Sequence, residues 1–171
     1  MGKLREPLSQ LAADCPLPAA LEAMGERWSF LILRASFYGR HHFEEWLDEL
    51  GIARNILSNR LTRLVESGIL KRAPCDDDRR KIEYRLTEKA LALLPTMLAL
   101  RQWGERSESG VPSNPVLVDE RDRQPIQPVA LRAHDGRILT HHDLCWADRA
   151  DLKEPGEETD ERFAVKRLAS M

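Results

Sequence analysis

The sequence predicts an α+β fold in which several helices precede a two-stranded hairpin and a longer apolar helix. Apolar residues recur at helical spacing as far as Gly68, alternate with polar ones between residues 69 and 86, and return to helical spacing after Thr87. The 171 residues are 42% hydrophobic and 32% charged, which is typical of globular proteins. These observations predict a helical core with a small sheet.

Three helices are predicted before residue 51. Residues 19–24 favour a helix that stops at Gly25, and residues 28–37 favour a longer helix with two apolar stripes. A helix that is apolar on two sides needs two packing partners. Residues 43–50 repeat the helical spacing, and Gly51 follows at the position where a left-handed glycine ends a helix.

The helix predicted for residues 53–67 has one apolar face and one polar face. At about 100° per residue, Leu57, Leu61 and Leu64 share one side. Polar and cationic side chains occupy the opposite side and its flanks, and Gly68 ends the helix. The side chains that we expect to contact DNA from this face are Arg54, Asn55, Ser58, Asn59, Thr62 and Arg63.

Residues 69–73 and 82–86 are predicted as the two strands of a hairpin, because apolar residues alternate with charged ones in the second strand. Residues 74–81 form the connecting loop. Three aspartates in this loop precede its cations, which are Arg79, Arg80 and Lys81. The loop is either a solvated turn, in which the aspartates neutralise the cations, or a basic tip that touches DNA.

Thr87 suits the N-cap of the next helix, which the apolar spacing extends to about Arg106 and in which Pro95 predicts a kink. Residues 1–106 are therefore predicted as the main domain, and residues 107–115 as a linker.

The remaining sequence predicts a small β extension at residues 116–148. It contains an expected strand at 116–118 and a hairpin of residues 129–133 with 138–140. Residues 149–171 are predicted as an acidic, flexible tail.

Charge is unevenly distributed, although the formal net charge is only −2. Residues 51–85 hold nine basic and five acidic side chains, a net of +4, whereas the chain from Ser107 onward holds nine basic and thirteen acidic ones, a net of −4. Only the first region is suited to face phosphate groups.

The order of these elements is the plan of a winged helix-turn-helix domain. A helix about 10 to 12 Å wide fits the major groove of B-DNA. We expect helix 53–67 to read the major groove and the loop 74–81, the wing, to touch the backbone or minor groove. The alternative is an interaction module that binds a protein partner or a small ligand. An enzyme is disfavoured, because the sequence has no recognisable catalytic triad, phosphate-binding loop or carboxylate pair.

Surplus apolar surface on two helices predicts a homodimer that binds a pseudo-palindromic operator. Aromatic residues at helical spacing favour core or interface over a ligand cage. The residues expected at the dimer interface are Trp28, Leu31, Leu94, Leu98 and Trp103.

Short motifs distributed from residue 15 to residue 106 resemble the HxlR family of regulators. They are Cys15-Pro16, Gly25-Glu-Arg-Trp28, Ile32-Leu-Arg34, Phe43, Leu57-Ser-Asn-Arg-Leu61, Leu64-Val-Glu-Ser-Gly68, Tyr84-Arg-Leu-Thr87 and Trp103-Gly104. The resemblance implies a dimeric bacterial regulator whose terminal helices form the dimer interface and whose polar-faced helix reads DNA. Residues 129–140 resemble a β extension of some longer members.

The three cysteines are far apart and form no Cys-x-x-Cys pair, so we expect reduced thiols and no zinc site. In the resembled family, some members sense oxidants or electrophiles through a cysteine at the position of Cys15. The alternative for Cys15 is an inert, packed side chain. The histidine pairs at 41–42 and 141–142 fit no common metal spacing. No cofactor is expected, and the absence of a long apolar run or signal sequence predicts a cytoplasmic protein without a membrane partner.

Overall fold

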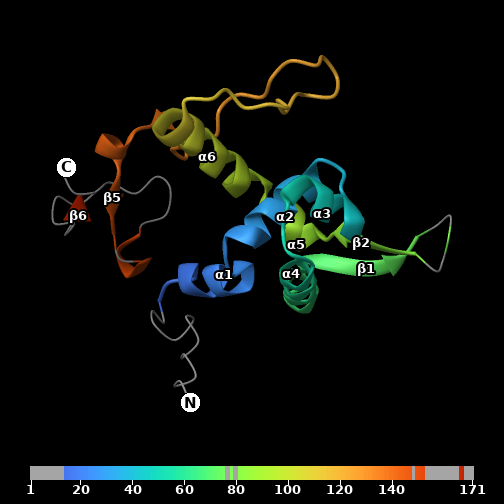
Figure 1. Cartoon of the computed structure of the whole chain (residues 1–171). Coiled ribbons are helices and arrows are strands. Elements are labelled where there is room, and N and C mark those ends of the chain that lie inside the picture. The colour runs from blue at the N-terminus through green and yellow to red at the C-terminus, as the bar shows by residue number, and fades with distance from the viewer. Residues whose placement is uncertain (1–13, 76–77, 79–80, 148, 153–165, 168–171) are drawn as a thin grey trace. The chain divides into compact units, whose positions relative to one another are not determined.

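The computed structural model describes residues 14–75, 78, 81–147, 149–152 and 166–167. The chain divides into two compact units, residues 1–114 and residues 115–171, which are described separately. In the first unit the order of elements is helical up to a two-stranded sheet and helical again after it (Figure 1).

Four helices open the first unit, close to the predicted positions. Their bounds are α1, Leu17–Met24; α2, Arg27–Phe37; α3, Phe43–Leu50; and α4, Arg54–Glu66. Figure 1 shows α3 and α4 grouped around α2. Gly51, at φ 58°, ends α3 in the left-handed conformation and turns the chain toward α4.

A hydrophobic core holds these helices together. Its largest fully buried side chains come from α2, α3, α4 and the start of the sheet, and they are Ile32, Leu33, Trp46, Leu57, Leu61, Leu64, Ile69 and Leu70. Because α2 places apolar residues on two sides, it packs against α3 as well as α4. The prediction that α2 needs two partners is therefore confirmed.

The predicted hairpin consists of β1, Leu70–Pro74, and β2, Ile82–Leu86. The strands are antiparallel, with Leu70 opposite Leu86 and Pro74 opposite Ile82. Figure 1 shows this pair as a ribbon that extends away from the helices.

The prediction of one kinked helix from Thr87 to Arg106 is wrong. The chain forms two helices, α5, Glu88–Leu91, and α6, Leu94–Gly104, which continues as a π-helical turn, η2, Glu105–Ser109. Pro95 lies in the first turn of α6, where its missing N–H group leaves no hydrogen bond unmade. The helix therefore restarts before the proline and runs past the predicted end into the first residues of the expected linker.

The second unit is made of short elements. Two-residue strands β3, Leu131–Arg132, and β4, Ile138–Leu139, form the predicted hairpin, and β5, Cys145–Trp146, pairs with β6, Lys166–Arg167. The helical turns are η3, His141–Asp143, and η4, Arg149–Asp151. The expected strand at 116–118 is reduced to one bridge, between Val118 and Pro125.

Part of the expected flexible tail is thus paired in a strand, at Lys166–Arg167, while residues 153–165 and 168–171 lie outside the described residues. No helix in the described part of the chain is long and apolar enough to cross a membrane.

Candidate nucleic-acid interface

Helix α4 buries one side and exposes the other. Leu57, Leu61 and Leu64 are at most 1% exposed and fix the helix on the core. The six residues expected to contact DNA are all exposed, and they are Arg54, Asn55, Ser58, Asn59, Thr62 and Arg63. The polar face predicted from the sequence therefore lies on the surface.

Arg54 is held by a neighbouring helix. Its two terminal nitrogens donate to the two carboxylate oxygens of Glu44 in α3, at 2.8 and 2.9 Å, and its guanidinium lies 5.3 Å from the ring centre of Phe43. The hydrogen bonds from Arg54 lower the pKa of Glu44, and Glu44 raises the pKa of Arg54. The pair leaves less of the arginine charge available to DNA than local sequence suggests.

Two other side chains of α4 have internal roles. The Thr62 hydroxyl donates to the backbone oxygen of Ser58 at 3.0 Å, so part of its hydrogen-bonding capacity is used inside the helix. Arg60 is mostly buried, with a side chain 16% exposed, and forms an ion pair with Glu26 at the start of α2. Arg60 therefore anchors α4, whereas Asn55, Ser58 and Asn59 present the amide and hydroxyl groups.

Strand β2, which follows the wing, is attached to the turn between α2 and α3. The backbone N–H of Tyr84 donates to the oxygen of His41 at 2.8 Å, and Nδ1 of His42 lies 3.3 Å from the oxygen of Ile82. The ring of Tyr84 also packs edge-on against buried Trp46, with centres 5.6 Å apart. These contacts tie strand β2 to the first helix of the helix-turn-helix.

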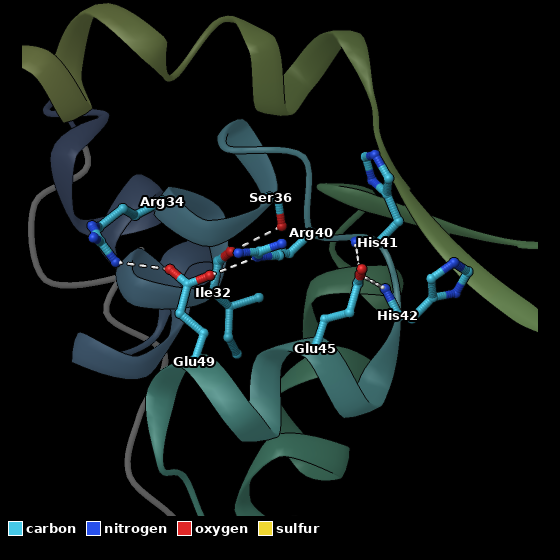
Figure 2. A network of polar contacts seen from close by, with 8 residues as sticks. All are labelled: Ile32, Arg34, Ser36, Arg40, His41, His42, Glu45 and Glu49. Carbon is cyan, nitrogen blue, oxygen red and sulfur yellow. Dashed lines mark hydrogen bonds and ion pairs between the residues drawn. The ribbon is translucent and has the colours of Figure 1, made fainter. Parts of the chain in front are cut away.

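Glu45 of α3 stabilises the same turn through hydrogen bonds to its backbone. Its Oε2 accepts the backbone N–H groups of His41 and His42, both at 2.8 Å, as Figure 2 shows. Burial tends to raise the pKa of Glu45, but the two backbone hydrogen bonds and nearby positive charges outweigh it, so the pKa is lowered. A charged carboxylate thus satisfies two N–H groups at the start of α3.

At the wing tip, Lys81 is exposed, and its backbone oxygen accepts the N–H of Cys75 at 3.0 Å. Arg79 and Arg80, also expected to contact DNA, lie outside the described residues. The described part of the wing thus presents one of the three predicted cations.

The residues expected at a dimer interface fall into two groups. Leu31, Leu94 and Leu98 line a groove between α2 and α6 within the first unit. Trp28 is partly buried against the core, and Trp103 is 52% exposed on α6. Three of the five expected residues thus line one groove, and the dimer interface stays a prediction.

The cysteines are not paired in disulfides, and Cys15, for which sensing is one of two interpretations, is exposed just before α1. Its role in sensing stays a prediction. Within the described ranges, no cluster of three or more His, Cys, Asp or Glu side chains could hold a metal ion.

The chain is similar to a known family of helix-turn-helix proteins and to curated transcriptional regulators. A family model described as HxlR-like helix-turn-helix matches residues 23–110. The HTH-type transcriptional regulator Mb3122 of Mycobacterium bovis is 46% identical over 86 residues, which are 50% of this chain and 54% of that protein. The chain therefore spans about half the length of the curated relatives it matches.

Solved structures of related proteins have a similar fold. PA1607, a candidate transcription factor, has a TM-score of 0.72 and 39% identity, over 82% of this chain and 99% of its own. The redox regulator HypR in its oxidized form has a TM-score of 0.51 and 28% identity, over 56% of this chain and 99% of its own. The predicted winged helix-turn-helix fold is thereby confirmed. Because residues 1–114 are two thirds of the chain, the likeness to PA1607 extends into the second unit.

Proposed function

Because the chain belongs to the HxlR-like helix-turn-helix family, we propose that it is a transcriptional regulator that binds double-stranded DNA as a homodimer. The observation that carries this proposal is the exposed polar face of α4, opposite three fully buried leucines. A helix of this width enters the major groove with its polar side chains toward the base edges.

The side chains of α4 have separate roles in this proposal. Asn55 and Asn59 carry amides that can pair with the N6 and N7 edge of adenine, and the Ser58 hydroxyl can donate to or accept from any base. Arg63 is exposed toward the C-terminal part of the helix and supplies positive charge for phosphate or guanine. Arg54 is already paired with Glu44, and the main effect of this pair is to fix the direction of the Arg54 guanidinium.

The wing and the second subunit complete the proposed complex. The loop 74–81, with exposed Lys81, reaches the backbone or minor groove beside the site of α4. Two-fold symmetry sets two copies of α4 about 34 Å apart, one turn of DNA, so the operator is a pseudo-palindrome.

The first test measures base reading. An operator is selected from genomic fragments by the purified protein, and binding to it is compared with binding to a random duplex by fluorescence anisotropy. Asn55→Ala weakens operator binding by about 1 to 3 kcal/mol, because a base edge loses its partner, and leaves affinity for the random duplex unchanged. Gln127→Ala, which removes an exposed amide from the second unit, serves as the matched control and has no effect.

Two results would contradict the proposal. If no fragment is enriched and random duplex does not bind at low salt, the domain is an interaction module for a protein partner or small ligand. If operator and random duplex bind alike and Asn55→Ala has wild-type affinity, the polar face is only solvated.

A further inference from the structure

The groove between α2 and α6 has the size and walls of a small-molecule site. Its volume is about 340 Å³, within the range of about 300 to 1,000 Å³ that is usual for such sites. Phe30 and Phe37 contribute aromatic walls from α2, and Leu94 and Leu98 contribute aliphatic walls from α6. A flat ring system is the chemical shape that these walls favour.

The charged groups along this groove have one sign. Arg34 and Arg101 line it, and none of the described lining residues is acidic. The guanidinium of Arg34 lies 5.0 Å from the ring centre of Tyr38, another lining residue, which holds it at the groove. An occupant with a negative charge is therefore favoured over a neutral or cationic one.

The charge of Arg34 is only partly neutralised, because its carboxylate partner, Glu49, also binds Arg40. Glu49 accepts Nε of Arg40 at 2.8 Å and Nη1 of Arg34 at the longer distance of 3.2 Å, as Figure 2 shows. The hydrogen bond with Glu49 raises the pKa of Arg40. Glu45, the other carboxylate near Arg40, is engaged by two backbone N–H groups. Glu49 is thus shared by two guanidiniums, and its contact with Arg34 is the longer one.

We propose that this groove binds an aromatic carboxylate, with the ring between the walls of α2 and α6 and the carboxylate on the guanidinium of Arg34. Bidentate hydrogen bonding from arginine suits a carboxylate, and the apolar walls remove the ring from water. Such a ligand would contact the core helix α2 and the last long helix α6 at once. Binding to the groove is measured without DNA, so its outcome is independent of the proposed DNA contacts, although Leu31, Leu94 and Leu98 are also expected at the dimer interface.

The test uses 2-naphthoate as the probe and 2-naphthamide as its neutral counterpart, with affinities taken from NMR chemical shifts of the full chain. A ligand of this size that fits is expected to bind with Kd on the order of 1 mM or tighter. The amide binds about 10-fold more weakly, because it offers Arg34 no charge. The shifted signals belong to residues of α2 and α6.

Two substitutions are expected to act in opposite directions. Arg34→Gln weakens naphthoate binding about 10-fold and leaves naphthamide binding unchanged. Glu49→Gln releases Arg34 and tightens naphthoate binding by about threefold or more. Arg27→Gln removes an arginine of α2 that lies over Trp28 outside the groove, and serves as the matched control. Circular dichroism establishes that each variant is folded.

The proposal is overturned if naphthoate and naphthamide bind alike, or if Arg34→Gln and Arg27→Gln have equal effects. It is also overturned if the wild-type chain shows no shifts at about 10 mM naphthoate, in which case a second copy of the chain is the favoured occupant of the groove. Should Arg34→Gln fail to fold, the expected gain of affinity in Glu49→Gln decides, since no gain there contradicts the role of Arg34.

Discussion

Arg54 shows how one ion pair changes the charge that helix α4 presents on its surface. The arginine stands in the first turn of α4, where its charge would ordinarily meet phosphate. Glu44 holds both terminal nitrogens instead, and both side chains of the pair are 66% exposed. At such exposure the pair adds little to stability, so its main effect is to lower the positive charge of the surface and to orient the guanidinium.

Glu44→Gln is expected to increase non-specific DNA binding. Releasing the charge of Arg54 adds about one phosphate contact, so the salt dependence of binding to a random duplex steepens by about one ion and affinity at low salt rises. Anisotropy titrations at several salt concentrations measure both quantities.

The pH dependence and the control of this prediction follow from the pair itself. Because Arg54 lowers the pKa of Glu44 from its ordinary range, the carboxyl is ionised at neutral and mildly acidic pH, and the pair is lost only as the pH falls through the lower folded value. The difference between wild type and Glu44→Gln is therefore the same at pH 5.5 and pH 8. Asp48→Asn removes a negative charge from the same helix without releasing an arginine, so an equal increase in that variant would contradict the explanation.

At the scale of elements, Thr87 joins the end of the sheet to the start of α5. Its hydroxyl oxygen accepts the N–H of Ala90 at 3.3 Å and lies 2.8 and 3.0 Å from the backbone oxygens of Gly68 and Ile69, to which it donates. One side chain therefore caps a helix and also satisfies carbonyl groups after α4.

Thr87→Val keeps the shape of the side chain and removes its hydrogen bonds, so it is expected to lower the free energy of unfolding by about 1 to 2 kcal/mol. Thr87→Ser retains the hydroxyl and stays within about 0.5 kcal/mol of wild type. Urea denaturation followed by circular dichroism measures both. Equal stabilities of the valine and serine variants would show that the hydroxyl does not matter.

Element positions were largely predictable because each helix and strand of the first unit has a local signal. Periodic leucines locate α4, and alternation locates β2. The division between α5 and α6 was not predictable, because the apolar spacing continues through it and Pro95 fits either a kink or a first turn.

The candidate site was predictable only in part, for a related reason. The exposed face of α4 follows from helical geometry alone. The Glu44–Arg54 pair and the groove depend on contacts between elements that are separate in sequence, and the groove joins residues of α2 to residues more than 50 positions later in α6. Such contacts are set by packing, which local patterns do not encode.

For the whole molecule, the helices after the sheet carry exposed apolar residues that a second copy of the chain could cover. Leu91, Leu100 and Trp103 are 44%, 48% and 52% exposed, and exposed apolar side chains that lie close together are typical of protein interfaces. We expect Trp103→Glu to give a monomer at micromolar concentration, because a charge in an apolar interface must be desolvated. Light scattering measures the mass, and operator binding weakens because the two half-sites are no longer linked.

The matched control for this prediction is Ile138→Glu, which places the same charge on an exposed apolar residue, 58% exposed, in the second unit. It is expected to remain dimeric. If wild type is already a monomer and one half-site binds as tightly as two, the dimer proposal is wrong.

The attachment of strand β2 to the α2–α3 turn has a consequence for the DNA sequence itself. The backbone oxygen of His41 and Nδ1 of His42 both contact β2, so this strand is fixed relative to the turn that leads into α3. On the DNA contacts proposed above, inserting one base pair between the sites of α4 and the wing displaces one from the other by about 3.4 Å and rotates it by about 35°. Operators bound in this way would therefore keep a constant number of base pairs between the site of α4 and the site of the wing. The identity of the bases between these two sites could vary freely.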